Sequence, residues 1–204
     1  MNIAEATDGM LNNVKDVLDL MVGGHFGKRM TLEQILYMSM IGKGDCLYYV
    51  MVGDDKGSYV QDFIRLMVNV SGQESVNYLN HNELFTGIHL LSNSDKLVIG
   101  SGTVAKTMSE KDDVVLKYLV DGESLYIKPL YPRVDSFTLR FGGVVVQKVD
   151  KSSFEEFIGS MSESLKRRVS MIEFVEVDVK ERFNFDGDVE FIEELKLYLM
   201  ERYG

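Results

Sequence analysis

The sequence predicts an α+β fold in which an antiparallel β-meander over about residues 96–150 is covered by helices from the N- and C-terminal segments. Three observations support this prediction. Short stretches in the middle of the chain alternate apolar and polar residues, which is typical of strands with one buried face. Residue pairs suited to tight turns, such as Asp121-Gly122, separate these stretches. Helical apolar patterns come before and after them, and this order of elements favours α+β.

The predicted meander consists of short strands that are neighbours along the chain. Its clearest alternation places Phe137, Leu139 and Phe141 on one face. Local antiparallel pairing is the simplest way to join strands with such short connections. The strands are expected over residues 97–99, 103–105, 113–120, 125–128, 136–141 and 144–149.

The segment Gly100-Ser101-Gly102-Thr103 lies between two of these strands and has two interpretations. A phosphate-binding loop would need a helix directly after the glycines, because the backbone N–H groups and the helix dipole bind the anion together. The residues that follow have the composition of a strand. The sequence therefore favours a hairpin turn.

The N-terminal part of the chain reads as mostly helical with a possible β-hairpin. Residues 47–52 are rich in strand-forming side chains. Residues 58–70 fit a strand or a helix equally well, so both interpretations stay open. Helices are expected over residues 3–22, 32–41 and, for the most part, 73–92.

The C-terminal part reads as helix, strand and helix. A capping-box pattern at Ser153 opens the first helix, which continues through Leu165 to Arg168. Residues 171–179 alternate like a strand, and a final helix covers residues 189–203. A weak boundary near residues 92–95 divides the chain into 1–92 and 96–204, and the alternative is a single domain over 1–204.

Composition places the chain among soluble globular proteins. The 204 residues carry a net charge of −10, with 45% hydrophobic and 26% charged residues. The negative charge disfavours nucleic acid as a partner, because phosphate neutralisation dominates such binding. No apolar run is long enough to span a membrane, and the N-terminus lacks a secretory signal pattern. With a single cysteine, a cytoplasmic location is expected.

Candidate catalytic and metal-binding residues are few, and none forms a recognised pattern. Cys46 would need an adjacent base, and only His25, His81 and His89 could supply an imidazole. A buried structural cysteine is the simpler interpretation. No histidine or cysteine spacing matches a zinc site. We predict no catalytic residue, no metal and no cofactor.

Two loops fail tests for specific ligands. The segment Gly23–Arg29 lacks the glycine spacing of a phosphate-binding loop and follows a helix, so an interhelical linker is expected. Residues 182–193 resemble a calcium-binding loop, but Arg182 stands where a carboxylate is required. A turn followed by an N-cap at Asp188 explains that segment better.

Two surfaces are candidate binding sites. The final helix has apolar residues on more than one side, so it could contact both its own sheet and a partner. Its candidate partner-binding residues are Phe191, Leu195, Tyr198 and Leu199. Lys166, Arg167 and Arg168 form a candidate anion-binding site, although basic residues also suit the last turn of a helix.

These sequence features lead to three functional hypotheses. The first is a non-catalytic assembly or adaptor protein that binds a protein partner or associates with itself. The second is an enzyme whose polar site carries no sequence motif. The third is a nucleic-acid contact through the local basic patch at residues 166–168.

Overall fold

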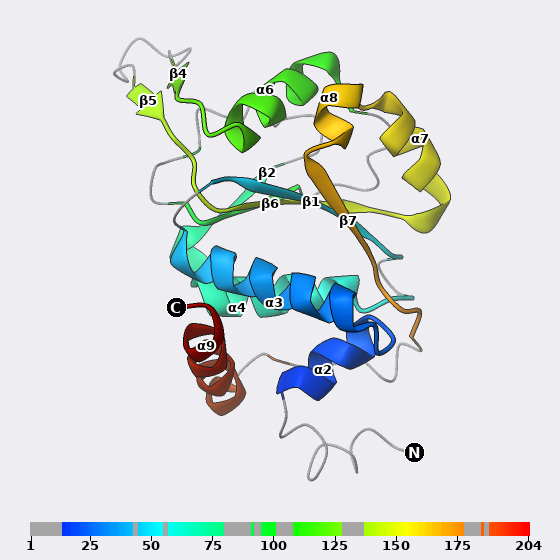
Figure 1. Ribbon diagram of the computed structural model, residues 1–204, viewed down its shortest axis with the longest axis vertical. Coiled ribbons are helices and arrows are strands. Elements are labelled where there is room, and N and C mark those ends of the chain that lie inside the picture. Colours follow the sequence, from blue (N-terminus) through cyan, green and yellow to red (C-terminus); the bar gives the residue numbers. More distant parts are fainter. Residues whose placement is uncertain are drawn as a thin grey trace.

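The computed structural model describes residues 14–42, 45–54, 57–79, 91, 95–100, 108–127, 137–177, 185 and 188–204. Its central feature is a five-stranded sheet in the order β2-β3-β6-β1-β7, with helices on both faces (Figure 1). Every pairing in this sheet is parallel. The protein is therefore α/β, and the predicted antiparallel meander over residues 96–150 is wrong.

The sheet takes its strands from distant parts of the chain. Its members are β1 (Leu47–Val52), β2 (Val76–Leu79), β3 (Leu97–Gly100), β6 (Val144–Val149) and β7 (Val169–Glu173). The central strand β6 pairs with β1 from Leu47↔Val144 onward and with β3 from Leu97↔Val144 onward. Strands from both sides of the boundary predicted near residues 92–95 thus belong to one sheet.

Burial on both faces explains why the pairing is parallel. All six residues of β6 are buried, and so are five of the six in β1. Strands of this kind are nearly continuous apolar runs, because helices cover both faces of a parallel sheet. Tyr49 and Met51 of β1 belong to the core on one face, whereas Tyr48 and Val50 belong to the core on the other.

Four helices lie on the side of the first face: α3 (Phe26–Ile41) and α4 (Val60–Ser71) next to the sheet, and α2 (Val14–Met21) and α9 (Val189–Tyr203) beyond them (Figure 1). Helix α4 decides between the two interpretations of residues 58–70. Its Phe63 and Met67 are fully buried in the first core, one helical turn apart. The predicted helix over residues 3–22 is described only from residue 14.

Three helices cover the second face: α6 (Glu110–Val120), α7 (Phe154–Ser160) and α8 (Glu163–Lys166) (Figure 1). The strand predicted over residues 113–120 is thus helix α6. Val115, Leu116 and Leu119 of α6 are buried, whereas Val114 and Tyr118 are exposed. The buried residues follow helical spacing, and the apparent alternation of the sequence was accidental.

A short antiparallel hairpin is the part of the predicted meander that the structure retains. It joins β4 (Leu125–Ile127) to β5 (Phe137–Leu139), at the periphery of the main sheet (Figure 1). Strand β3 does not form the hairpin predicted with residues 103–105, because parallel neighbours occupy both its edges. Residues 101–107, including most of the glycine loop, lie outside the described part.

The segment predicted as a helix over residues 73–92 is different in its first half. A turn of 3-10 helix (Gln73–Ser75) leads into β2, and residues 80–90 lie outside the described residues. The C-terminal helix at residues 189–203 is confirmed, and Asp188 caps it by accepting a hydrogen bond from the N–H of Phe191. Among the described helices, none is long and apolar enough to cross a membrane.

Candidate functional site

The carboxyl ends of the parallel strands define the edge where a site is expected. The chain leaves β1 toward α4 on the first face, but it leaves the neighbouring strand β6 toward α7 on the second face. In open α/β sheets, ligands bind in the crevice outside the carboxyl ends at such a switch point. The loop between β1 and α4, residues 53–59, is therefore the candidate functional site.

This loop is closed by its own hydrogen bonds. The N–H of Gly57 donates to the carbonyl oxygen of Asp54 at 3.3 Å, and the Ser58 hydroxyl donates to the same oxygen at 2.9 Å. The N–H of Val60 donates in turn to the Ser58 hydroxyl at 3.4 Å. The N–H groups of Gly57 and Val60 are thus engaged within the loop.

The interior of the loop is filled by the chain. Ser58 is 1% exposed, and its side chain lies so close to Gly53 that a Cβ there would collide with it. The first turn of α4 also carries Asp62, which is fully buried. A carboxylate at this end of a helix complements the positive end of the helix dipole. The first turn thus carries a carboxyl group of the protein itself, at the end of the helix where the dipole would favour a bound phosphate.

The sequence of the loop departs from the phosphate-binding pattern G-x-x-x-x-G-K-[ST]. Three residues, not four, separate Gly53 from Gly57, and Ser58 follows Gly57 where the pattern has lysine. Lys56 precedes the second glycine instead. In that pattern the lysine reaches the β- and γ-phosphates, so the loop has the position of a nucleotide-binding loop but not its chemistry.

The segment that follows strand β7 contacts the loop. The N–H of Val177 donates to the carbonyl oxygen of Gly57 at 2.8 Å, and Ser58 forms an antiparallel bridge with Glu176. Lys151, which follows β6, contacts Glu173 at 3.0 Å and Glu176 at 3.7 Å. The bond to Lys151 lowers the pKa of Glu173.

Comparisons with known proteins identify a shared fold. No family model matches the chain, and no curated protein matches it. Solved structures do match the chain. An A-form apo structure of the NrS-1 C-terminal region superposes with a TM-score of 0.53 at 12% identity, over 91% of this chain and 42% of that one. A second apo structure of the same region gives a TM-score of 0.54 at 15% identity, with 91% and 43% covered.

The likeness concerns the arrangement of the elements. At identities of 12% and 15%, the comparison shows the fold alone. The chain also spans less than half of the NrS-1 chains that it matches. Any further property of this chain must therefore be argued from its own residues.

The candidate partner-binding residues of α9 face their own chain. Leu195 and Leu199 are fully buried, and Phe191 is 9% exposed, in the core that α9 shares with α3 and α4. Tyr198 is half-buried, and its hydroxyl donates to Glu33 at 2.9 Å. Their role in binding a partner stays a prediction, and the outward side of α9 consists of other residues.

Sequence reasoning missed a buried acidic cluster that holds α9 in place. Glu33 of α3 is fully buried and accepts hydrogen bonds from Tyr198 and Tyr203, each at 2.9 Å. Arg202 lies 2.9 Å from the same carboxylate, and Arg29 lies 3.5 Å from it. The glutamate and α9 are far apart in sequence, so no local pattern links them.

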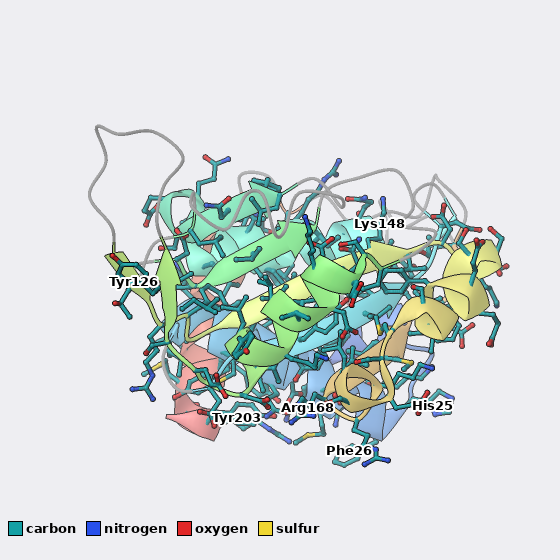
Figure 2. The ribbon with its side chains drawn as sticks, turned by 90° about the horizontal axis from the view of Figure 1, so that it is seen from above. His25, Phe26, Tyr126, Lys148, Arg168 and Tyr203 are labelled. Atoms are coloured by element: carbon teal, nitrogen blue, oxygen red, sulfur yellow. The ribbon has the colours of Figure 1, made fainter. Side chains whose placement is uncertain are left out.

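The candidate anion-binding residues lie at the end of the short helix α8 and directly after it, and they are partly neutralised within the chain. Lys166 forms an ion pair with Glu163 at 2.8 Å. Arg168 binds both carboxylate oxygens of Asp121, at 2.6 and 3.2 Å, on the exposed surface (Figure 2). Arg167 is exposed. Two of the three cations thus have acidic neighbours, and their affinity for an external anion stays a prediction.

The other candidates do not converge on a site. Cys46 is 1% exposed, and burial raises the pKa of its thiol to about 12. His25 lies at the periphery beside Phe26 (Figure 2), whereas His81 and His89 are outside the described residues. So are residues 182–184, 186 and 187 of the calcium-like segment at residues 182–193. Within the described ranges, no three side chains of metal-ligating type lie together.

One sequence signal could have located the loop at residues 53–59. A strand-like run over residues 47–52, two glycines and a possible helix from residue 60 together form a strand–loop–helix unit. This unit was not recognised, because residues 58–70 fitted a strand as well as a helix. If they formed a strand, the two glycines would belong to the turn of a β-hairpin.

Proposed function

We propose that this chain is a non-catalytic interaction module, which acts by binding a protein partner. The observation that carries this proposal is the closed loop between β1 and α4. In an α/β sheet this is the position for phosphate chemistry, yet here the buried Ser58 hydroxyl is bonded to the loop's own backbone and the lysine of the phosphate-binding pattern is missing.

The outward side of α9 supports the second half of the proposal. Val189, Leu197 and Met200 are 70%, 65% and 49% exposed. Exposed apolar side chains grouped on one helix are typical of surfaces that bind another protein. The inner side of the same helix is fixed by the first core and by the Glu33 cluster, so the surface is held in one orientation.

Charge indicates the kind of partner. Leu197 lies on the outward side of α9 among exposed glutamates. The lysine next to it in sequence, Lys196, forms an ion pair with one of these glutamates, Glu193, at 2.9 Å. A basic amphipathic segment would match both the apolar and the acidic residues. A second copy of the chain is disfavoured, because a two-fold interface brings like charges together. The glutamates are Glu190, Glu193, Glu194 and Glu201.

A nucleotide titration tests the non-catalytic part. ATP with Mg²⁺ is added to the purified protein, and heat release and thermal unfolding are followed. We expect no saturable heat and no rise of the melting temperature at millimolar nucleotide. Saturable binding that Ser58→Trp abolishes, or hydrolysis of ATP by the purified chain, would overturn the proposal.

A pull-down from a lysate of the source organism tests the interaction. The variant Leu197→Glu should lose a partner that the unchanged protein retains. Leu20→Glu is the matched control, because Leu20 is an exposed apolar residue on another helix, at 53%. A partner retained equally by both variants, or none in repeated experiments, would contradict the assignment of α9.

A further inference from the structure

A small cavity lies on the second face of the sheet, under helix α6 and away from the loop at residues 53–59. Its volume is about 20 Å³. Strands β1, β2, β3 and β6 form its floor, and α6 with Met108 forms its roof. Most of the lining is apolar, but Tyr48, Asp112 and Gln147 also contribute to it.

The hydroxyl of Tyr48 has no hydrogen-bond partner within the described part of the chain. The residue is 2% exposed and lies on β1, in the middle of the sheet. Leaving a buried hydroxyl unsatisfied is costly, and such groups in native proteins usually bind an ordered water. Tyr48 therefore requires a partner that the described residues do not provide.

The neighbouring groups are polar and face the same space. Asp112 and Asp113, in the first turn of α6, are close enough to raise the pKa of Tyr48 beyond the effect of burial. Asp112 is 3% exposed and lines the cavity with Tyr48. The Ser109 hydroxyl donates to Asp112 at 2.7 Å, which holds the carboxylate in place. A carboxylate is a strong acceptor for a water that itself accepts from the tyrosine.

We propose that this cavity binds one ordered water molecule, which accepts a hydrogen bond from the Tyr48 hydroxyl and donates one to the Asp112 carboxylate. The volume fits, because a cavity of roughly 10–15 Å³ or more admits a water. The site joins strand β1 of the sheet to the first turn of α6, through two residues, Tyr48 and Asp112, that are more than 60 positions apart in the chain.

Other occupants fit less well. A cavity of about 20 Å³ is too small for an organic ligand. Calcium and magnesium need about six oxygen ligands, and here one carboxylate lines the space, since Asp113 is bonded to Lys117 at 3.0 Å and to the N–H of Ser162 at 2.9 Å. An apolar occupant would leave the hydroxyl unsatisfied.

The sign of the stability change in Tyr48→Phe tests the proposal. If water satisfies the hydroxyl, the variant loses a hydrogen bond, and its unfolding equilibrium constant rises about two- to tenfold. If the hydroxyl is unsatisfied, removing it relieves a desolvation cost, and the constant falls. Tyr49→Phe is the matched control, because Tyr49 is the next residue of β1 and its side chain belongs to the core on the opposite face. A Tyr48→Phe variant as stable as the unchanged protein, or more stable, would overturn the proposal.

A direct observation completes the test. A high-resolution crystal structure of the full chain should contain density for one water within hydrogen-bond distance of Tyr48 and Asp112. Crystals exposed to pressurised xenon should show no xenon there, because xenon enters dry apolar cavities. A dry cavity, or one that binds xenon, would contradict the inference.

Discussion

At the scale of single residues, the environment of Cys46 determines its reactivity. The thiolate is the reactive form of cysteine, and burial raises the pKa of this thiol to about 12. We expect the native protein to react with a thiol reagent such as DTNB at pH 8 at least a hundredfold more slowly than the unfolded chain. The absorbance of the released thiolate measures both rates, with the urea-unfolded protein as control. Rapid labelling of the native protein would restore Cys46 as a candidate nucleophile.

Gly143 is a second residue whose identity is fixed by its surroundings. Its φ of +151° lies in a region that favours glycine, and a Cβ would collide with the carbonyl oxygen of Lys96. That oxygen also accepts the N–H of Val144, at 3.0 Å, at the start of β6. We expect Gly143→Ala to lower the free energy of unfolding by about 1–3 kcal/mol.

Chemical denaturation measures this change, and Gly159→Ala is its matched control. Gly159 lies in α7 with nothing within 4 Å of its Cβ position. Alanine there should raise the free energy of unfolding by about 0.5–1 kcal/mol, because alanine is the better helix former. Equal effects of the two substitutions would contradict the steric argument.

Local sequence signals predicted some of the helices but not all of them. The helix at residues 189–203 and its cap at Asp188 were predicted, because the apolar pattern and the capping residue agree. Helix α6 was missed although Ser109 caps it and three acidic residues occupy its first turn. The alternation of Val114, Leu116 and Tyr118 outweighed these signals, since an eight-residue window fits both periods.

At the scale of elements, the buried carboxylate of Glu33 attaches α9 to α3. Two tyrosine hydroxyls and two arginines surround it. Removing one partner of a buried ionic cluster leaves the other charges uncompensated. We expect Glu33→Ala to lower the free energy of unfolding by about 3–5 kcal/mol, and Tyr198→Phe to lower it by about 1 kcal/mol.

Urea denaturation followed by circular dichroism measures both effects. Glu194→Ala is the control, because this glutamate is on the outward side of α9, where surface substitutions change stability by about 0.5 kcal/mol or less. If Glu33→Ala were as mild as Glu194→Ala, the cluster would not be what holds α9 to the core.

The candidate site shows why element-level prediction was incomplete. The strand at residues 47–52 was predicted, but its pairing with β6 and β7 could not be, since those strands lie about 100 residues away. Without the parallel pairing, the loop at residues 53–59 has no special position. The Glu33 cluster and the Tyr48 cavity depend on similar long-range contacts.

At the scale of the whole molecule, an apolar core lies on each face of the sheet. Strands buried on both faces are apolar throughout, and such runs were the sequence signal for the parallel fold. The run Val144-Val145-Val146 is uniformly apolar, as expected for a strand with helices on both faces. The predicted meander included it as a last strand, because the chain nearby contains a genuine hairpin, β4–β5.

The same burial predicts how stability depends on pH. Burial raises the pKa of Tyr49 to about 12, and burial together with the bond to Glu33 does the same for Tyr198; the pKa of Tyr48 is also raised. In the unfolded chain these groups titrate near pH 10. Between about pH 10 and 12 the native state therefore binds more protons than the unfolded state, and the free energy of unfolding falls as pH rises.

Urea midpoints at pH 8, 10 and 11, with tyrosinate absorbance near 295 nm as an independent titration, measure this dependence. The midpoint should be nearly constant up to about pH 9 and should then fall steeply. Tyr49→Phe should make the fall shallower, because it removes one of the raised groups without altering the Glu33 cluster. A midpoint that stays level through pH 11, or tyrosines that all titrate near pH 10 in the native protein, would mean that the two cores do not bury these side chains.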